Sequence, residues 1–227
     1  MAQSQNQRLR RMAEKAARRK AVVAQKRRAE AAAAAVSESL QILDAAKAPN
    51  FACFATEALF DIGMGWVIAA RYLPSGSVAA SFFLVDAWFL GVKDAFFVVS
   101  SRHKFEEQRR AQGYEHPLKP MDPPVARQLL RDAAAYAASN GVPPNEDFAE
   151  AELIFGDVPM AEQTFTFGKD GEPVYMPGPD DTPALIRRMM IQIAKEMIRD
   201  DFDATVEAAA STIDPSAVLA TAVPNDG

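Results

Sequence analysis

The sequence predicts an α+β domain that carries a long basic helix at its N-terminal side. Residues 66–99 hold runs of β-branched and aromatic residues around a Pro-Ser-Gly turn, which is typical of a β-hairpin. Residues 8–47 consist mainly of strong helix formers, and no Gly or Pro precedes Pro49. Several later segments show helical spacing of apolar residues between Gly and Pro. At 227 residues, with 49% apolar and 24% charged residues, the chain fits one globular domain with extensions.

The net charge of −5 is distributed unevenly along the chain. Residues 1–30 contain ten basic and two acidic residues, for a charge of +8, whereas residues 31–227 carry −13. We therefore divide the chain into a basic Ala-rich helical arm (1–48), an α+β globular domain (49–205) and a flexible, disordered C-terminal tail (206–227). Such asymmetry indicates an arm that seeks a polyanion or an acidic partner.

The arm lacks an apolar stripe in its first half, because basic residues lie on all sides of the predicted helix. A helix of this kind crosses solvent or binds something charged. Near its end, Val36, Leu40 and Leu43 recur at i, i+4 and i+7. We expect these three side chains to dock on the globular domain, and Pro49 to end the helix.

The central part of the chain is expected to form a small antiparallel sheet. Residues 51–60, "FACFATEALF", predict a short amphipathic helix that ends before Gly63. Residues 66–73 then pair with residues 77–85 as a hairpin, and residues 91–99 provide a third strand.

The C-terminal half is expected to be mainly helical. "RHKFEEQRRAQG" predicts a short solvated helix, and "HPLKPMDPP" a Pro-rich linker in which Asp122 caps the next helix. Further expectations are a helix over 145–155, a second hairpin in "TFTFGKDGEPVYM", and a last helix capped by Thr182. The apolar face predicted for this last helix comprises Ile186, Met189, Met190, Ile193 and Met197.

Membrane insertion and secretion are both disfavoured by the sequence. The most apolar stretch, residues 78–99, contains Asp86, Lys93 and Asp94, each of which costs about 2.5–3.5 kcal/mol near a bilayer centre. A single cysteine, Cys53, excludes an intramolecular disulfide and a cysteine-based zinc site. We expect no secretory signal and a cytoplasmic location.

Three segments, "FLVD…FLGVKDAFF", "IFGDV" and "FTFGKDGEPVY", occur in a fixed order. Together they resemble a group of uncharacterised bacterial proteins with an LVD-x₂-CLGVK core followed by IFGD and FGKDGKP segments. The resemblance spans about residues 55 to 200. The group has no established activity, so the resemblance implies no function. Phe89 stands where the core of that group has a cysteine, so a role for that cysteine would be absent here.

Asp86, Lys93 and Asp94 are the weak candidates for a catalytic site, because charges within an apolar run must be paired, turned to the surface, or functional. We favour the structural interpretation, in which the strand ends at Asp86 and the other two lie in a turn. His103 and Glu107 share a helix face, but no third ligand follows at a recognisable spacing, so no metal site is predicted. No complete catalytic or nucleotide-binding motif occurs. The sequence therefore implies no cofactor and favours a protein that is not an enzyme.

The basic arm is the strongest functional signal. It contains no aromatic residue that could stack on bases, so we expect contacts with the nucleic-acid backbone and little sequence preference. The candidate contact residues are Arg8, Arg10, Arg11, Lys15, Arg18, Arg19, Lys20, Lys26, Arg27 and Arg28.

Three hypotheses of function stay open. The first is a non-enzymatic accessory protein whose arm engages nucleic acid or a ribonucleoprotein. The second is an intracellular enzyme that uses Asp86, Lys93 and Asp94. The third is a protein-interaction module whose arm binds an acidic protein partner.

Overall fold

The computed structural model describes residues 20, 24–26, 36–178 and 181–212. Its centre is a five-stranded antiparallel sheet with the strand order β4-β3-β2-β1-β5, and helices pack against both of its faces. The strands are β1 (Asn50–Thr56), β2 (Met64–Tyr72), β3 (Ser77–Asp86), β4 (Gly91–Ser101) and β5 (Leu118–Met121). The α+β class predicted from the sequence is confirmed.

The hairpin and the third strand are confirmed as well. β2 pairs with β3 from Met64↔Asp86 to Tyr72↔Val78, and β3 pairs with β4. The hairpin closes because the Leu73 N–H donates to the Ser77 carbonyl at 2.9 Å, while Gly76 takes a positive φ of 85° in open space. The Pro-Ser-Gly signal therefore identified the turn correctly.

The prediction of a helix over residues 51–60 is wrong. Residues 50–56 form β1, which pairs with β2 on one side and with β5 on the other. Phe51, Cys53 and Ala55 join one core cluster while Phe54 joins the other, as strand alternation requires. A short helix, α2 (Leu59–Ile62), follows the strand. Pairing with two neighbours overrides the helical propensity of the alanines here.

The "HPLKPMDPP" segment is not simply a linker, because β5 lies within it. Pro120 occupies a position in β5, opposite Phe54. A proline has no N–H to donate and is tolerated in a strand only at the edge of a sheet, which is where β5 lies. The proline content concealed a strand that closes one side of the sheet.

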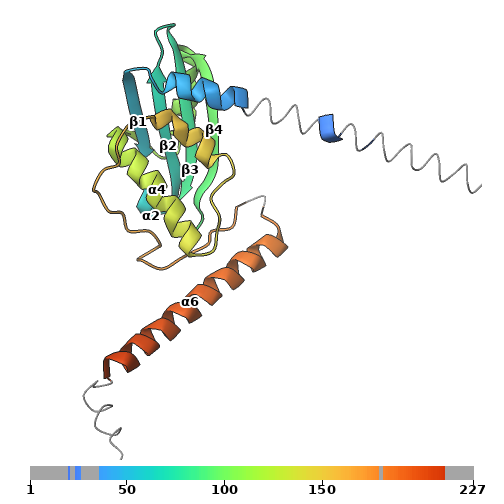
Figure 1. The fold of residues 1–227 in the computed structure, drawn as a ribbon, viewed down its shortest axis with the longest axis vertical. Helices are drawn as coiled ribbons and strands as arrows, with labels where there is room; N and C mark the ends of the chain where they lie inside the picture. Colours follow the sequence, from blue (N-terminus) through green and yellow to red (C-terminus); the bar gives the residue numbers. More distant parts are fainter. Residues whose placement is uncertain (1–19, 21–23, 27–35, 179–180, 213–227) are drawn as a thin grey trace, which may run out of the picture.

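Helices cover the two faces of the sheet unequally. Besides α2 and the helix at residues 36–45, the described helices are α3 (Arg102–Gln112), α4 (Pro123–Ser139), α5 (Phe148–Ala151), the 3₁₀ helix η1 (Glu152–Phe155) and α6 (Pro183–Thr212). In Figure 1, α4 and the helix formed by residues 36–45 lie on the same side of the sheet, where the larger core cluster is buried. Phe105 of α3 packs into the smaller cluster on the opposite face.

The helix at residues 36–45 docks by a different side from the predicted one. Ile42 and Ala45 are buried in the main core, whereas Val36, Leu40 and Leu43 are exposed. The Ser39 hydroxyl also donates to Glu150 of α5 at 2.5 Å. The apolar i, i+4, i+7 spacing was real but marks the outer face, because the domain contacts the adjacent row of side chains.

The predicted helix ends are partly confirmed. α4 begins at Pro123 after Asp122, although the Asp122 side chain makes no capping hydrogen bond. It ends at Ser139, and its C-cap is Asn140. In α3 the single buried side chain is Phe105, and the rest of the helix is half-buried or exposed.

The segment after α4 is less regular than predicted. The helix expected over 145–155 is two short helices, α5 and η1. The second predicted hairpin is reduced to one bridge between Lys169 and Glu172. The loops therefore wrap over the domain and form no second sheet in the described part of the chain.

The last helix begins as predicted, because the Thr182 hydroxyl accepts from the Leu185 N–H at 3.3 Å. On its predicted apolar face, Met189 and Ile193 are buried but Met190 and Met197 are exposed. α6 continues to Thr212, so residues 206–212, which were expected to be disordered, are helical. The rest of the predicted tail lies outside the described residues.

One buried arginine ties the layers together. Arg71 on β2 is 6% exposed and donates three hydrogen bonds to backbone carbonyls, at 2.8 Å to Ala48, 3.2 Å to Ile154 and 3.0 Å to Phe155. Its guanidinium also lies 3.7 Å from the centre of the Phe51 ring. Burial lowers the pKa of this guanidinium from its ordinary value. Arg71 thus holds the chain before β1 and the end of η1 against the sheet.

Candidate functional site

Most of the predicted nucleic-acid contacts lie outside the described residues. These are Arg8, Arg10, Arg11, Lys15, Arg18, Arg19, Arg27 and Arg28. Lys20 and Lys26 are described, and both are exposed on helical backbone. The long basic helix therefore remains a prediction from the sequence.

Asp86 ends β3 and is fully buried. Its Oδ1 atom accepts from the backbone N–H groups of Trp88 and Phe89, both at 2.9 Å. Burial raises the pKa of this carboxyl group, and the backbone N–H groups of Phe89, Trp88 and Leu90, together with the charge of Lys93, partly oppose that effect. The carboxylate caps the turn between β3 and β4, which supports the structural interpretation of this residue.

Lys93 lies at an irregular point of β4 and Asp94 follows it in the same strand, so the prediction that these two residues lie in a turn is wrong. Leu84 pairs with Asp94 and Val85 pairs with Val92, so Lys93 is the extra residue of a β-bulge. Asn145 secures the bulge, because its N–H and its side-chain amide donate to the carbonyls of Val92 and Lys93, each at 3.3 Å.

The three charged candidates do not converge on one point. Asp94 is exposed, and its carboxylate accepts from the N–H of the adjacent Ala95 at 2.9 Å. The positive charge of Lys93 favours the ionised form of Asp86, and also that of Asp181, which precedes α6. Sequence reasoning did not identify Asp181 as part of this cluster.

Tyr175 and Asp181 form the closest polar pair in this region. The Tyr175 hydroxyl donates to Asp181 Oδ2 at 2.5 Å, and the Gly178 N–H donates to the same oxygen at 2.6 Å. Burial, together with the hydrogen bond to Asp181, raises the pKa of Tyr175 to about 12. The same hydrogen bond and the Gly178 N–H lower the pKa of Asp181. Because the pKa of each group is shifted further from neutral pH, the pair is poorly suited to general acid–base catalysis near pH 7.

A more open feature lies on the α3 side of the sheet. It is a groove of about 450 Å³, between the ends of β2 and β3 and the loop that follows α3. Its lining residues are Thr56, Ile62, Met64, Gly65, Trp66, Leu84, Ala111, Gln112, Tyr114, Glu115 and His116. The volume lies within the range of small-ligand pockets. We call this feature the α3 groove.

The α3 groove combines an aromatic floor with a polar rim. Trp66 is half-buried and packs edge-on against Phe82 and Phe96, at ring-centre distances of 6.5 and 6.1 Å. On the rim, Tyr114 is 88% exposed, and His116 is exposed beside it. The groove therefore offers ring surfaces and hydrogen-bonding groups to a flat ligand with polar edges.

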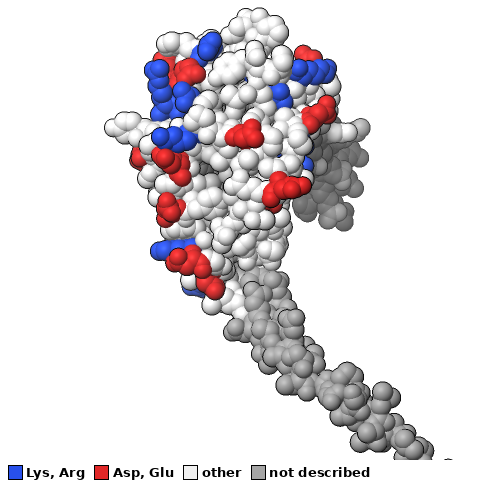
Figure 2. Space-filling view, turned by 90° about the vertical axis from the view of Figure 1, so that its left-hand side faces the viewer, with Lys and Arg blue, Asp and Glu red and all other residues white. Residues whose placement is uncertain are grey.

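No single-sign patch dominates the face of the globular domain drawn in Figure 2, where basic and acidic side chains alternate. Within the described residues, no group of three or more His, Cys, Asp or Glu side chains could hold a metal ion. In the same part of the chain, no helix is both long and apolar enough to cross a membrane.

Comparisons with known proteins do not assign the chain to a family. No protein-family model, no curated protein and no solved structure matches it. A functional interpretation must therefore come from the residues themselves.

Proposed function

We propose that this chain is a non-enzymatic accessory protein whose basic N-terminal arm engages nucleic acid or a ribonucleoprotein. The observation that carries the proposal is the opposite charge of the two segments, +8 on residues 1–30 and −13 on residues 31–227. A row of cations can neutralise several phosphates and release their counterions, which drives binding. The acidic remainder would be repelled by the same polyanion, so contact would be concentrated on the arm.

The α3 groove supports a single-stranded target in preference to a duplex. Bases of a single strand are free to stack on aromatic rings, and each stacked base contributes about 1–3 kcal/mol. Trp66 and Tyr114 offer such rings, and the exposed Arg110 on α3 lies next to the groove residue Ala111. In this proposal the arm holds phosphates and the groove receives one unpaired base.

The arm is tested by changing its charge without changing its length. In one full-length variant all ten basic residues of the arm become Gln, and in the matched control they all become Lys. Binding of fluorescein-labelled mixed-sequence single-stranded RNA and DNA is followed by anisotropy. We expect the Lys arm to retain most of the affinity and the Gln arm to lose it. Unchanged binding by the Gln arm would reject the proposal.

The groove is tested separately with Tyr114→Ala, because this exposed side chain can be removed with little effect on folding. We expect a roughly tenfold loss of affinity for single strands and none for duplexes, as loss of one stacked base implies. Met160→Ala, which also removes an exposed apolar side chain but lies outside the groove lining, is the control. Equal effects of the two variants would exclude the groove. An arm that captured an acidic protein but no nucleic acid would instead support the third hypothesis.

A further inference from the structure

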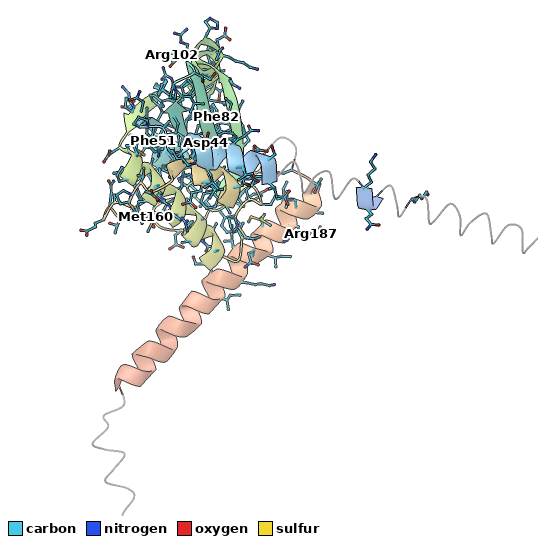
Figure 3. The ribbon with its side chains drawn as sticks, turned by 45° about the horizontal axis from the view of Figure 1, so that its top comes forward. Asp44, Phe51, Phe82, Arg102, Met160 and Arg187 are labelled. Carbon is cyan, nitrogen blue, oxygen red and sulfur yellow. The ribbon has the colours of Figure 1, made fainter. Side chains whose placement is uncertain are left out.

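α6 extends well beyond the part of the helix that the domain anchors. Near its start, Met189 and Ile193 are buried in a small cluster with Phe89 and Tyr175. The helix then runs away from the domain into solvent (Figure 1). Figure 3 shows Arg187 close to the domain end of the helix. Most of α6 is therefore available to another molecule.

The projecting helix carries an apolar stripe with no cover among the described residues. Met190, Ile191, Met197 and Ile198 are 55%, 50%, 52% and 70% exposed. At about 100° per residue, these positions and Ala194 fall within a sector of about 120°. We call these five residues the α6 stripe. Four exposed apolar side chains on one helix face are typical of an interaction surface.

Charge along α6 is also ordered. The first half of the helix carries Arg187, Arg188, Lys195 and Glu196, for a net charge of +2. The second half carries Arg199, Asp200, Asp201, Asp203 and Glu207, for a net charge of −3. A second copy of the helix running antiparallel would place each basic half against an acidic half. A parallel copy would place like charges together.

We propose that α6 is a self-association helix that pairs antiparallel with α6 of a second copy of this chain. The register that overlays the two stripes puts Ala194, a small residue, at the twofold axis. Met190 then faces Ile198, Ile191 faces Met197, and helix position 187 lies opposite helix position 201. Because such an interface is isologous, every one of these pairs occurs twice.

A second copy fits this surface better than the chain's own basic arm does. The arm could neutralise the acidic half of α6, but it has few apolar residues to cover the stripe. A second α6 supplies an equal stripe and the complementary charges at once. This inference is independent of the nucleic-acid proposal, so either can fail alone.

The stripe is tested by sedimentation velocity on nuclease-treated full-length protein over a concentration series. Ile198→Glu is compared with Leu185→Glu, which also replaces an exposed apolar residue of α6 but lies on the opposite side of the helix. We expect Ile198→Glu to raise the dimer Kd at least about tenfold, as loss of a central apolar contact does. Leu185→Glu should leave the Kd unchanged, and circular dichroism checks that both variants fold.

The register is tested by charge reversal. Arg187→Asp and Asp201→Arg should each weaken the dimer, and the double variant should restore it, because each reversed charge again faces its opposite. A wild-type chain that stays monomeric at about 100 µM, where mass action favours dimers, would overturn the proposal. So would equal effects of the two Glu variants, no recovery in the double variant, or loss of association on deletion of residues 1–30.

Discussion

Arg71 provides the most quantitative test of the fold. Arg71→Met removes three charge-assisted hydrogen bonds, to the carbonyls of Ala48, Ile154 and Phe155. The Phe155 carbonyl keeps a hydrogen bond from the Val158 N–H at 3.1 Å, so the loss falls mainly on the other two acceptors. A hydrogen bond to a charged group contributes about 1.5–3 kcal/mol. Relief of the guanidinium's desolvation, together with partial relaxation of the carbonyls, offsets part of the sum. We therefore expect the free energy of unfolding to fall by about 3 kcal/mol, below the simple total.

Chemical and thermal unfolding measure this change. For a chain of this size, about 3 kcal/mol corresponds to a decrease in Tm of about 6–12 °C. Hydrogen exchange should accelerate first in residues 42–50 and 152–156, which Arg71 joins. Arg102→Met is the matched control, because Arg102 also faces an aromatic ring, that of Tyr72 at 5.4 Å, but is exposed. We expect less than about 1 kcal/mol from the control. A loss below about 0.5 kcal/mol for Arg71→Met would refute the reasoning.

Three further predictions concern backbone, thiol and pH. Gly91 has φ +64°, and a Cβ there would lie 2.4 Å from a backbone oxygen of α4, whereas Gly76 has φ +85° in open space. In urea titrations, Gly91→Ala should lower the free energy of unfolding by about 3 kcal/mol or more, and Gly76→Ala should lower it by about 1–2 kcal/mol. The difference arises because only the Gly91 substitution adds a steric clash to the strain of a positive φ. Burial raises the pKa of Cys53 to about 12, so its thiol should react with an aromatic disulfide at pH 8 only after unfolding, and fast reaction of the native protein would contradict this. The lowered pKa of Asp181 contributes stability that is present above its unfolded pKa of about 3.9 and lost as pH falls through the folded value. Tyr175→Phe should therefore make stability less dependent on pH in the acid range, and a pH profile identical to the wild type would exclude the hydrogen bond as the cause.

The parts of the fold that the sequence predicted correctly are those with local signals. The turn at residues 74–76 and the β-branched runs on either side identified β2 and β3 without knowledge of any neighbour. β1 was missed because its apolar residues also fit a helical period, and only pairing with β2 and β5 decides between the two structures. β5 was missed because Pro120 is compatible with a strand only at a sheet edge, which a sequence does not reveal.

The candidate sites likewise divide into features with a local sequence signal and features that depend on the tertiary structure. The end of β3 at Asp86 agrees with the favoured interpretation, but the sequence did not predict that the carboxylate is fully buried and held by backbone N–H groups. The contact of Tyr175 with Asp181 depends on a loop that returns six residues later, and no spacing rule predicts it. The α3 groove combines residues of β1, β2, β3 and α3 with the loop after α3, so only the assembled sheet brings them together.

The central claim is that the arm binds a polyanion through its phosphates. The most direct test is the slope of log(1/Kd) against log salt concentration for the full-length chain and a single-stranded oligonucleotide. Six to ten phosphate contacts predict that log affinity falls with a slope of about −4 to −7 for single strands. A slope near zero, or the same slope after all ten arm cations are replaced by Gln, would contradict the account.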